Sequence, residues 1–216
     1  MSVTRLIVGL IDHLLLGALG QTLGCLTLDG TLILAISGGL IFGGGGWTWG
    51  LLAAAVLIAH FGLTWRGFTS QETPHNGLRV VATWGPPALA ALVYGASEHT
   101  AAWAAFIGAI AFAAADEMEP AGKSPLAFSL VIGTLTGLTM LVLHDLAAVR
   151  RGLPTGWIDL WLIPLGTVGV LTGVAVRAWT RHWLYPDLAR FLGSASAAIV
   201  TAIIGQSGWQ LLTPIL

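Results

Sequence analysis

Charged residues are scarce in this sequence. Only 9% of the 216 residues are Asp, Glu, Lys or Arg, whereas 56% are hydrophobic and the mean hydropathy is +0.84. A soluble domain usually has about 25% charged residues, so the composition excludes an ordinary soluble domain. The net charge is only −1. The chain therefore has no excess of basic residues for a polyanion, and we expect no nucleic-acid partner.

Cysteine is almost absent as well. The single cysteine, Cys25, excludes an internal disulfide, an iron–sulfur motif and the Cys-x-x-Cys-His attachment of haem. The sequence also lacks the alternating short strands of an outer-membrane barrel, because its apolar runs are continuous over about 17–24 residues. No small-residue cleavage site follows the first run, which we therefore interpret as a retained helix. The sequence predicts an all-α, polytopic membrane protein whose residues 1–216 form one domain.

Glycine, proline and charge divide the chain into seven or eight expected helices. The second is short, so both a spanning and a re-entrant helix remain open. Four consecutive glycines, residues 43–46, predict a flexible turn between two antiparallel helices. The expected helices lie near residues 3–24, 30–44, 47–65, 78–97, 100–117, 125–147, 157–177 and 191–212.

The basic residues are distributed unequally between the two sides that eight spans would create. Three of them, Arg5, Arg150 and Arg151, fall on one side. An excess of Lys and Arg marks the cytoplasmic side, so the chain is expected in a bacterial-type inner membrane with the richer side in the cytoplasm. The richer side has Arg66, Arg79, Lys123, Arg177, Arg181 and Arg190.

Negative charge is concentrated in "AFAAADEMEP", residues 111–120. Asp116 and Glu119 are three residues apart and share a helix face if the helix extends that far. Pro120 predicts a helix end, where the helix dipole disfavours carboxylates. Water, Lys123 or a divalent metal ion could compensate this unfavourable interaction. Two interpretations therefore remain open, a solvated helix end and a metal site. The Gly-Lys-Ser that follows is no P-loop, because the preceding glycine is missing.

Histidines within apolar segments are the second candidate chemistry. His60 in "VLIAHFGLTW" and His13 in "GLIDHLLLG" are both expected inside the membrane, where an ionisable residue is costly and is a functional candidate. His60 is thus a candidate intramembrane ligand for haem or a chlorophyll-type magnesium. A hydrogen bond to a neighbouring helix is the alternative.

Five stretches resemble, in order, the transmembrane protein 19 family, which includes the plant phytyl-phosphate kinases. Asp116 in "AAFIGAIAFAAADEMEP" matches the family's Asp, and Asp187 in "LYPDLARFLGSASAAIV" matches the Asp of its last motif. "FSLVIGTLTGL" resembles the Val-Ser-x-x-Gly-Thr-x-Ala-Gly helix, with Ser129, Gly133 and Thr134 at the matching positions. The five stretches are residues 26–67, 79–95, 104–120, 128–138 and 184–200.

The resemblance implies a kinase that phosphorylates a membrane-embedded isoprenoid phosphate on the cytoplasmic face. Mg²⁺ and a nucleoside triphosphate would be required. The implied catalytic residues are Asp116, Asp187 and Lys123. The implied metal ligands are Asp116, Glu119 and Asp187. Arg181 and Arg190 would join Lys123 at the phosphates, and the prenyl tail would lie among small residues such as Gly133 and Gly137. The implied substrate-binding set is Ser129, Gly133, Thr134, Gly137, Arg181 and Arg190.

Departures from the family pattern leave a second interpretation open. The family's Thr-x-Ala-Ser-Glu continuation is replaced by Glu-Met-Glu-Pro, Val170 stands where the family has an acidic residue, and Arg190 stands where it has the last Asn. A catalytically degenerate member would bind a lipid or pigment, or act as a structural subunit beside membrane protein partners. A small transporter is the weakest alternative, since only the helix number favours it.

Overall fold

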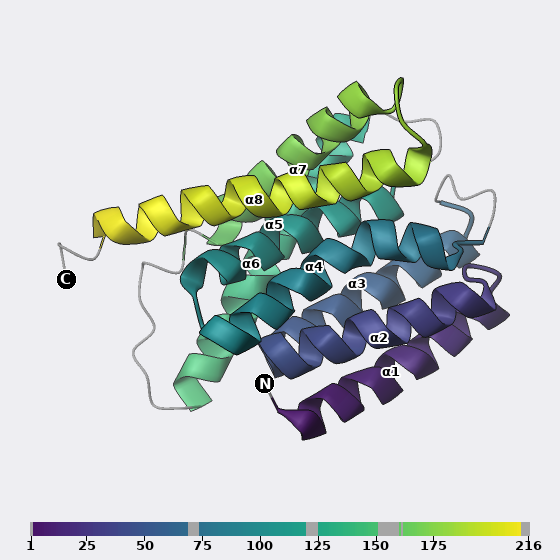
Figure 1. Ribbon diagram of the computed structural model, residues 1–216, viewed down its shortest axis with the longest axis horizontal. Coiled ribbons are helices and arrows are strands. Elements are labelled where there is room, and N and C mark those ends of the chain that lie inside the picture. The colour runs from purple at the N-terminus through teal and green to yellow at the C-terminus, as the bar shows by residue number, and fades with distance from the viewer. Residues whose placement is uncertain (1, 69–73, 120–124, 151–159, 161, 213–216) are drawn as a thin grey trace.

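The computed structural model describes residues 2–68, 74–119, 125–150, 160 and 162–212, and within them the chain forms eight helices. Each lies where the apolar runs predict it, with ends that differ by a few residues. The helices form a bundle in which the first and last helices lie on opposite sides (Figure 1). The helices are α1 (Val3–Thr22), α2 (Leu28–Gly45), α3 (Trp47–Trp65), α4 (Gly77–Ser97), α5 (Thr100–Glu117), α6 (Pro125–Arg150), α7 (Leu162–Thr180) and α8 (Pro186–Leu212).

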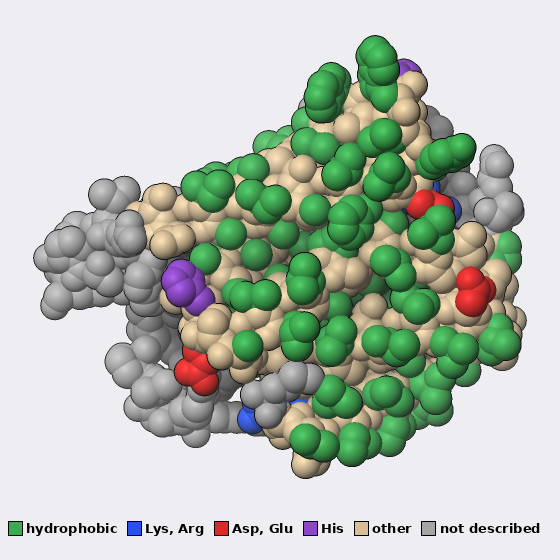
Figure 2. Space-filling view, viewed as in Figure 1, with side chains coloured by type: hydrophobic (Ala, Val, Ile, Leu, Met, Phe, Trp, Pro, Cys, Tyr) green, Lys and Arg blue, Asp and Glu red, His purple; other side chains and the backbone are tan. Residues whose placement is uncertain are grey.

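Seven of these helices are long and apolar enough to cross a membrane. The remaining one, α4, has 21 residues and packs against α2, α5 and α8. Leu, Ile, Val and Trp side chains are widely exposed, because they face lipid and not water. Figure 2 shows hydrophobic side chains spread over the visible face, with charged ones near its edges. The predicted all-α, polytopic membrane protein is thus confirmed.

Helix α2 bears on one open alternative and corrects one expectation. The helix is 18 residues long and is long and apolar enough to cross a membrane, which favours the spanning alternative over the re-entrant one. The glycines do not form an extended flexible turn, since Gly43, Gly44 and Gly45 continue the helix and only Gly46, at φ +82°, ends it. A Cβ at Gly44 would collide with the backbone of Ala91 in α4. Close packing of α2 against α4 is therefore the physical reason for Gly44.

The alanine-rich helix α5 lies at the centre of the bundle. It contacts α4, α6, α7 and α8, and its residues 109–115 are almost completely buried. Small side chains let several helix backbones approach α5 together. Helix α5 ends at Glu117. Its last two residues, Asp116 and Glu117, therefore place two consecutive carboxylates inside the bundle near one end.

Candidate functional site

Polar side chains converge where α1, α3, α5 and α7 end and the even-numbered helices begin. We call this region the Asp116 end. Asp29 at the start of α2 accepts a hydrogen bond of 2.7 Å from the backbone N–H of Gly77 at the start of α4. The loop segment at His75 pairs with the segment after α1, through His75 N–H to Cys25 O at 2.8 Å and Thr27 N–H to His75 O at 3.0 Å. These contacts fix the helix ends relative to one another.

Asp116 is the centre of an arginine–carboxylate cluster that also contains Glu119, Arg177, Asp187 and Arg190. Its carboxylate is bound by Arg177 Nη1 on one oxygen, and Arg190 Nε lies 3.2 Å from the other. Arg177 donates two further hydrogen bonds of 3.2 Å to Glu119, and Arg190 donates one of 3.0 Å to Asp187. A buried carboxylate is stable only when it is paired in this way.

Four predicted site residues meet around a cavity of about 110 Å³ beside this cluster. Asp116, Glu119, Ser129 and Arg181 line it together with Arg177. Ser129 is buried near the start of α6, whereas Arg181 is exposed just beyond α7. The cavity therefore combines a hydroxyl, two carboxylates and two guanidinium groups, which are donors and acceptors suited to a phosphate or a hydrated ion.

Gly133, Thr134 and Gly137 lie elsewhere, on the face of α6 that packs against α7. A Cβ at Gly133 would come within 2.9 Å of the carbonyl oxygen of Gly166, and a Cβ at Gly166 would come within 3.1 Å of the backbone nitrogen of Gly137. Thr134 shares a hydrogen bond of 3.0 Å with Thr167. The backbones of α6 and α7 are therefore in close contact at these glycines, and the expected prenyl site beside them stays a prediction.

The expected magnesium ligands do not form a compact group. Asp116, Glu119 and Asp187 are each bound by an arginine, and within the described residues their oxygens do not gather closely enough to share one ion. Their role at a metal stays a prediction. Lys123, expected at the phosphates, lies outside the described residues.

A different group at the Asp116 end does have the spacing of metal ligands. His60 in α3, His75 before α4 and Glu117 at the end of α5 are all buried, and their ligand atoms lie within 4.8 Å of one another. We call this the His–His–Glu cluster. His75 Nδ1 lies 3.1 Å and His60 Nε2 lies 3.7 Å from the same oxygen of Glu117. The two imidazole rings are nearly parallel, at 24°, with centroids 5.4 Å apart.

Sequence reasoning named His60 but missed its two neighbours. His75 falls in a polar loop. Glu117 directly follows Asp116, but its side chain lies against His60 and His75. The available signal was that the chain reverses between α3 and α4, which returns His75 to the membrane end near His60. The hydrogen bond between His60 and Glu117 joins residues 57 positions apart, and no local sequence pattern reveals such a contact.

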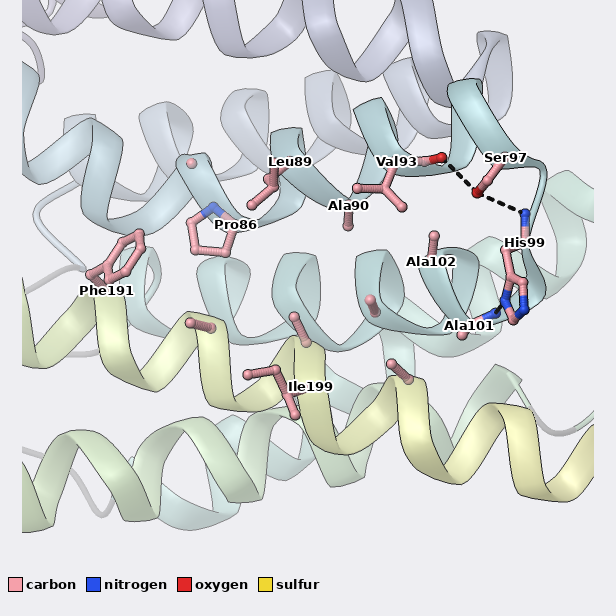
Figure 3. Close-up of a pocket in the computed structure, with 15 residues that line it drawn as sticks. Pro86, Leu89, Ala90, Val93, Ser97, His99, Ala101, Ala102, Phe191 and Ile199 are labelled. Carbon is pink, nitrogen blue, oxygen red and sulfur yellow. Dashed lines mark hydrogen bonds between the residues drawn. The ribbon is translucent and has the colours of Figure 1, made fainter.

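An apolar groove of about 720 Å³ runs between α4, α5 and α8. Figure 3 shows Pro86, Leu89 and Val93 of α4 facing Phe191 and Ile199 of α8, with Ser97 and His99 at the far end. Small residues of α5 and α8 form its floor. The lining is Gly85, Pro86, Leu89, Ala90, Val93, Ser97, His99, Ala101, Ala102, Ala105, Phe191, Ala195, Ala198, Ile199 and Ala202.

Comparisons with known proteins add nothing to this geometry: no protein-family model, curated protein or solved structure matches the chain. The resemblance to the transmembrane protein 19 family stays a prediction.

Proposed function

We propose that this protein binds a prenyl monophosphate, such as phytyl phosphate, and transfers to it a phosphoryl group from a nucleoside triphosphate. The observation that supports this most is the relation between the groove and the arginine–carboxylate cluster. Phe191 lines one end of the groove, and the preceding residue, Arg190, contacts Asp116. A lipid with its tail in the groove would therefore have its head beside arginine side chains.

The groove suits a hydrocarbon tail. Its lining is almost entirely aliphatic and aromatic, and it extends along α4 from Gly85 to Ser97, which is about 18 Å at 1.5 Å per helical residue. That length is more than half of a hydrocarbon core about 30 Å thick. Branched prenyl chains would pack against the alanines of α8 as readily as straight acyl chains, so the head group has to supply the specificity.

The reaction would proceed at the Asp116 end. A terminal oxygen of the lipid phosphate attacks the γ-phosphorus of the nucleotide, the bond between that phosphorus and the β–γ bridging oxygen breaks, and a nucleoside diphosphate leaves. Enzymes accelerate such a transfer mainly by positioning and by neutralising charge. Arg177, Arg181 and Arg190 would contact phosphate oxygens through bidentate guanidinium groups. Mg²⁺ would accompany the nucleotide.

The ion pairs would have to exchange partners for this reaction. In the described arrangement the arginines occupy the oxygens of Asp116. Arriving phosphates would bind Arg177 and Arg190, which frees Asp116, with Glu119 or Asp187, to bind Mg²⁺. Arginine–carboxylate pairs would thus be replaced by arginine–phosphate and magnesium–carboxylate pairs, with little change in net charge.

The completeness of those ion pairs also favours a second candidate function. Each of the carboxylates of Asp116, Glu119 and Asp187 already has an arginine partner. In a protein that only binds a lipid or pigment, as a subunit of a membrane complex, these ion pairs would serve to hold α5, α7 and α8 together. The arginine-rich Asp116 end supports a cytoplasmic orientation for either function, as in a bacterial-type inner membrane.

Phosphoryl transfer separates the two functions. Purified protein in nanodiscs would receive γ-labelled nucleoside triphosphate, Mg²⁺ and phytyl phosphate, and the extracted lipids would be analysed for labelled diphosphate. Wild-type protein should form this product, and Asp116→Asn should not. Absence of product from wild-type protein with each common nucleotide, together with a lipid or pigment that copurifies, would reject the kinase and support the binding subunit.

A further inference from the structure

The His–His–Glu cluster is the most unusual polar feature outside the arginine–carboxylate cluster. Its three side chains come from α3, from the segment before α4 and from α5, and all three are at least 95% buried. Buried imidazoles and carboxylates normally have hydrogen-bond partners. Among the described residues, His60 Nε2 and His75 Nε2 have none, and Glu117 Oε2 lies 3.1 Å from His75 Nδ1 and 3.7 Å from His60 Nε2. A buried carboxylate between two buried imidazoles requires a physical explanation.

We propose that His60, His75 and Glu117 bind one divalent transition-metal ion, for which Zn²⁺ is the probe. Two imidazole nitrogens and one carboxylate oxygen are a ligand set that Zn²⁺ uses in catalytic sites, where a fourth position remains for water or substrate. Fe²⁺ accepts the same set. Mg²⁺ prefers oxygen ligands only, so this site is chemically distinct from the magnesium site that the family resemblance implies.

The interatomic distances agree with this ligand set. Ligand atoms at about 2.0–2.2 Å from a tetrahedral ion are roughly 3.4 Å apart. His75 Nδ1 and His60 Nε2 lie 3.1 Å and 3.7 Å from Glu117 Oε2. These two distances are within a few tenths of an ångström of that value. The two imidazole nitrogens lie within 4.8 Å of each other, and side-chain rotation would bring them closer around an ion.

A hydrogen bond of His60 favours its role as a metal ligand. His60 Nδ1 lies 2.8 Å from the main-chain carbonyl oxygen of Glu117, and a carbonyl only accepts hydrogen bonds. Nδ1 must therefore carry the proton, which leaves the lone pair of the neutral ring on Nε2, directed toward the cluster. Histidine ligands of metals commonly donate their other N–H to a backbone carbonyl in this way.

The position of His75 is fixed by its backbone. Its N–H donates to Cys25 O at 2.8 Å, and its carbonyl accepts from the backbone N–H and the hydroxyl of Thr27, each at 3.0 Å. Gly30 allows this arrangement, because a Cβ at that position would collide with His75 O. The loop before α4 is thereby held against α2 with its imidazole inside the bundle.

Charge gives a further reason for a cation. Arg177 and Arg190 pair with Asp116, Glu119 and Asp187. Glu117 is a separate buried carboxylate that lies against two imidazoles. A divalent ion would compensate it. Since the groove and the arginine–carboxylate cluster contribute no ligand, this proposal stands independently of the proposed kinase.

Zinc binding to the full-length protein in detergent tests the site. Chelator-treated protein would be titrated with Zn²⁺ in competition with a chromogenic chelator. We expect one ion per chain and a rise in the unfolding temperature, since binding to the folded state alone stabilises it. His60→Gln, His75→Gln and Glu117→Gln should each weaken binding more than about 100-fold, beyond what the loss of an outer-shell partner costs.

His13→Gln is the matched control, because His13 is equally buried but lies in α1, outside the cluster. It should bind zinc like the wild type. If a cluster variant does not fold, Co²⁺ bound to the wild-type protein still gives an answer, since tetrahedral coordination by nitrogen and oxygen produces intense visible absorption. Octahedral Co²⁺ spectra, binding without defined stoichiometry, or unchanged affinity in both Glu117→Gln and His75→Gln would overturn the proposal.

Discussion

Asp116 and Glu117 are consecutive residues whose carboxylates enter two separate clusters. Asp116 is bound by Arg177 and Arg190 from α7 and α8, whereas Glu117 lies against His75 and His60 from the other half of the chain. Neighbouring positions of a helix point about 100° apart, so one helix end can supply both. The last two residues of α5 therefore contact polar side chains from both halves of the bundle.

Loss of the charge of Asp116 should destabilise the protein. Asp116→Asn leaves Arg177 and Arg190 without their shared buried partner. Breaking a fully buried ion pair costs about 3–5 kcal/mol. Arg177 and Arg190 keep 28% and 16% exposure, and water compensates part of the loss. We therefore expect a decrease of about 2–3 kcal/mol in the free energy of unfolding, measured by denaturant titration in mixed micelles.

A double-mutant cycle tests the physical cause. Arg177→Gln in the Asp116→Asn background should cost much less than in the wild-type background, because the pair is already broken. Strictly additive effects of the two substitutions would show that no energetic coupling joins these residues.

Much of the fold was predictable because lipid imposes a simple rule on sequence. Every spanning segment must be apolar over most of its length, and charged residues gather near the helix ends, as at Asp116 and Asp187. The interior of the bundle was harder. The spacing of Gly133 and Gly137 fits both a lipid-lined face and a helix contact, and the sequence does not show that both lie against Gly166 of α7.

The candidate site also has residues that the sequence predicts and residues that it does not. Asp116 was predictable because a carboxylate at the end of an apolar helix is conspicuous. Its partner Arg177 was seen only as one positive charge among several on that side of the membrane. His75 and Glu117 were not predicted as a pair, since they are 42 positions apart in the sequence and the whole of α4 and α5 separates them. Long-range pairing of polar groups follows from packing, which no local pattern encodes.

The contact between α6 and α7 should be sensitive to a single methyl group. Gly133→Ala would bring a Cβ within 2.9–3.0 Å of backbone atoms of Gly166 and Thr167. Backbone cannot move aside as a side chain does, so we expect destabilisation of about 1–3 kcal/mol, measured by thermal unfolding in detergent.

Gly62→Ala is the matched control within a helix, because nothing lies within 4 Å of a Cβ at that position in α3. It should leave stability unchanged or raise it by about 0.5–1 kcal/mol through helix propensity. Equal effects of the two substitutions would mean that the Gly133 contact is not close-packed in the membrane.

Cys25 should react slowly with thiol reagents in the folded protein. Its side chain is fully buried in the loop between α1 and α2, and burial raises the pKa of the thiol. A raised pKa leaves less thiolate at a given pH, and the thiolate is the reactive form. Maleimide labelling should therefore be slow at neutral pH, increase as the pH rises, and become fast when detergent denatures the protein. Fast labelling of the folded protein at neutral pH would contradict the buried position.

A bulky side chain in the groove should prevent lipid binding. Ala198 of α8 lines the groove floor, and Ala198→Trp would fill much of the space between α4 and α8. We expect lipids that copurify with the wild-type protein to be lost, and phytyl phosphate added to nanodiscs to bind at least about 10-fold more weakly, which corresponds to about 1.4 kcal/mol. Native mass spectrometry and a fluorescent lipid competition assay would measure the two effects.

Ile203→Trp provides the comparison for this substitution. Ile203 lies five residues further along α8, is 60% exposed toward lipid and is not part of the groove lining. The added ring there should enter the bilayer without changing lipid affinity, so any general effect of tryptophan on α8 is subtracted. If Ala198→Trp and Ile203→Trp bind phytyl phosphate equally well, the groove does not hold the tail. The head-group contacts at Arg190 would then have to account for binding alone, and short-chain prenyl phosphates should compete as well as long ones.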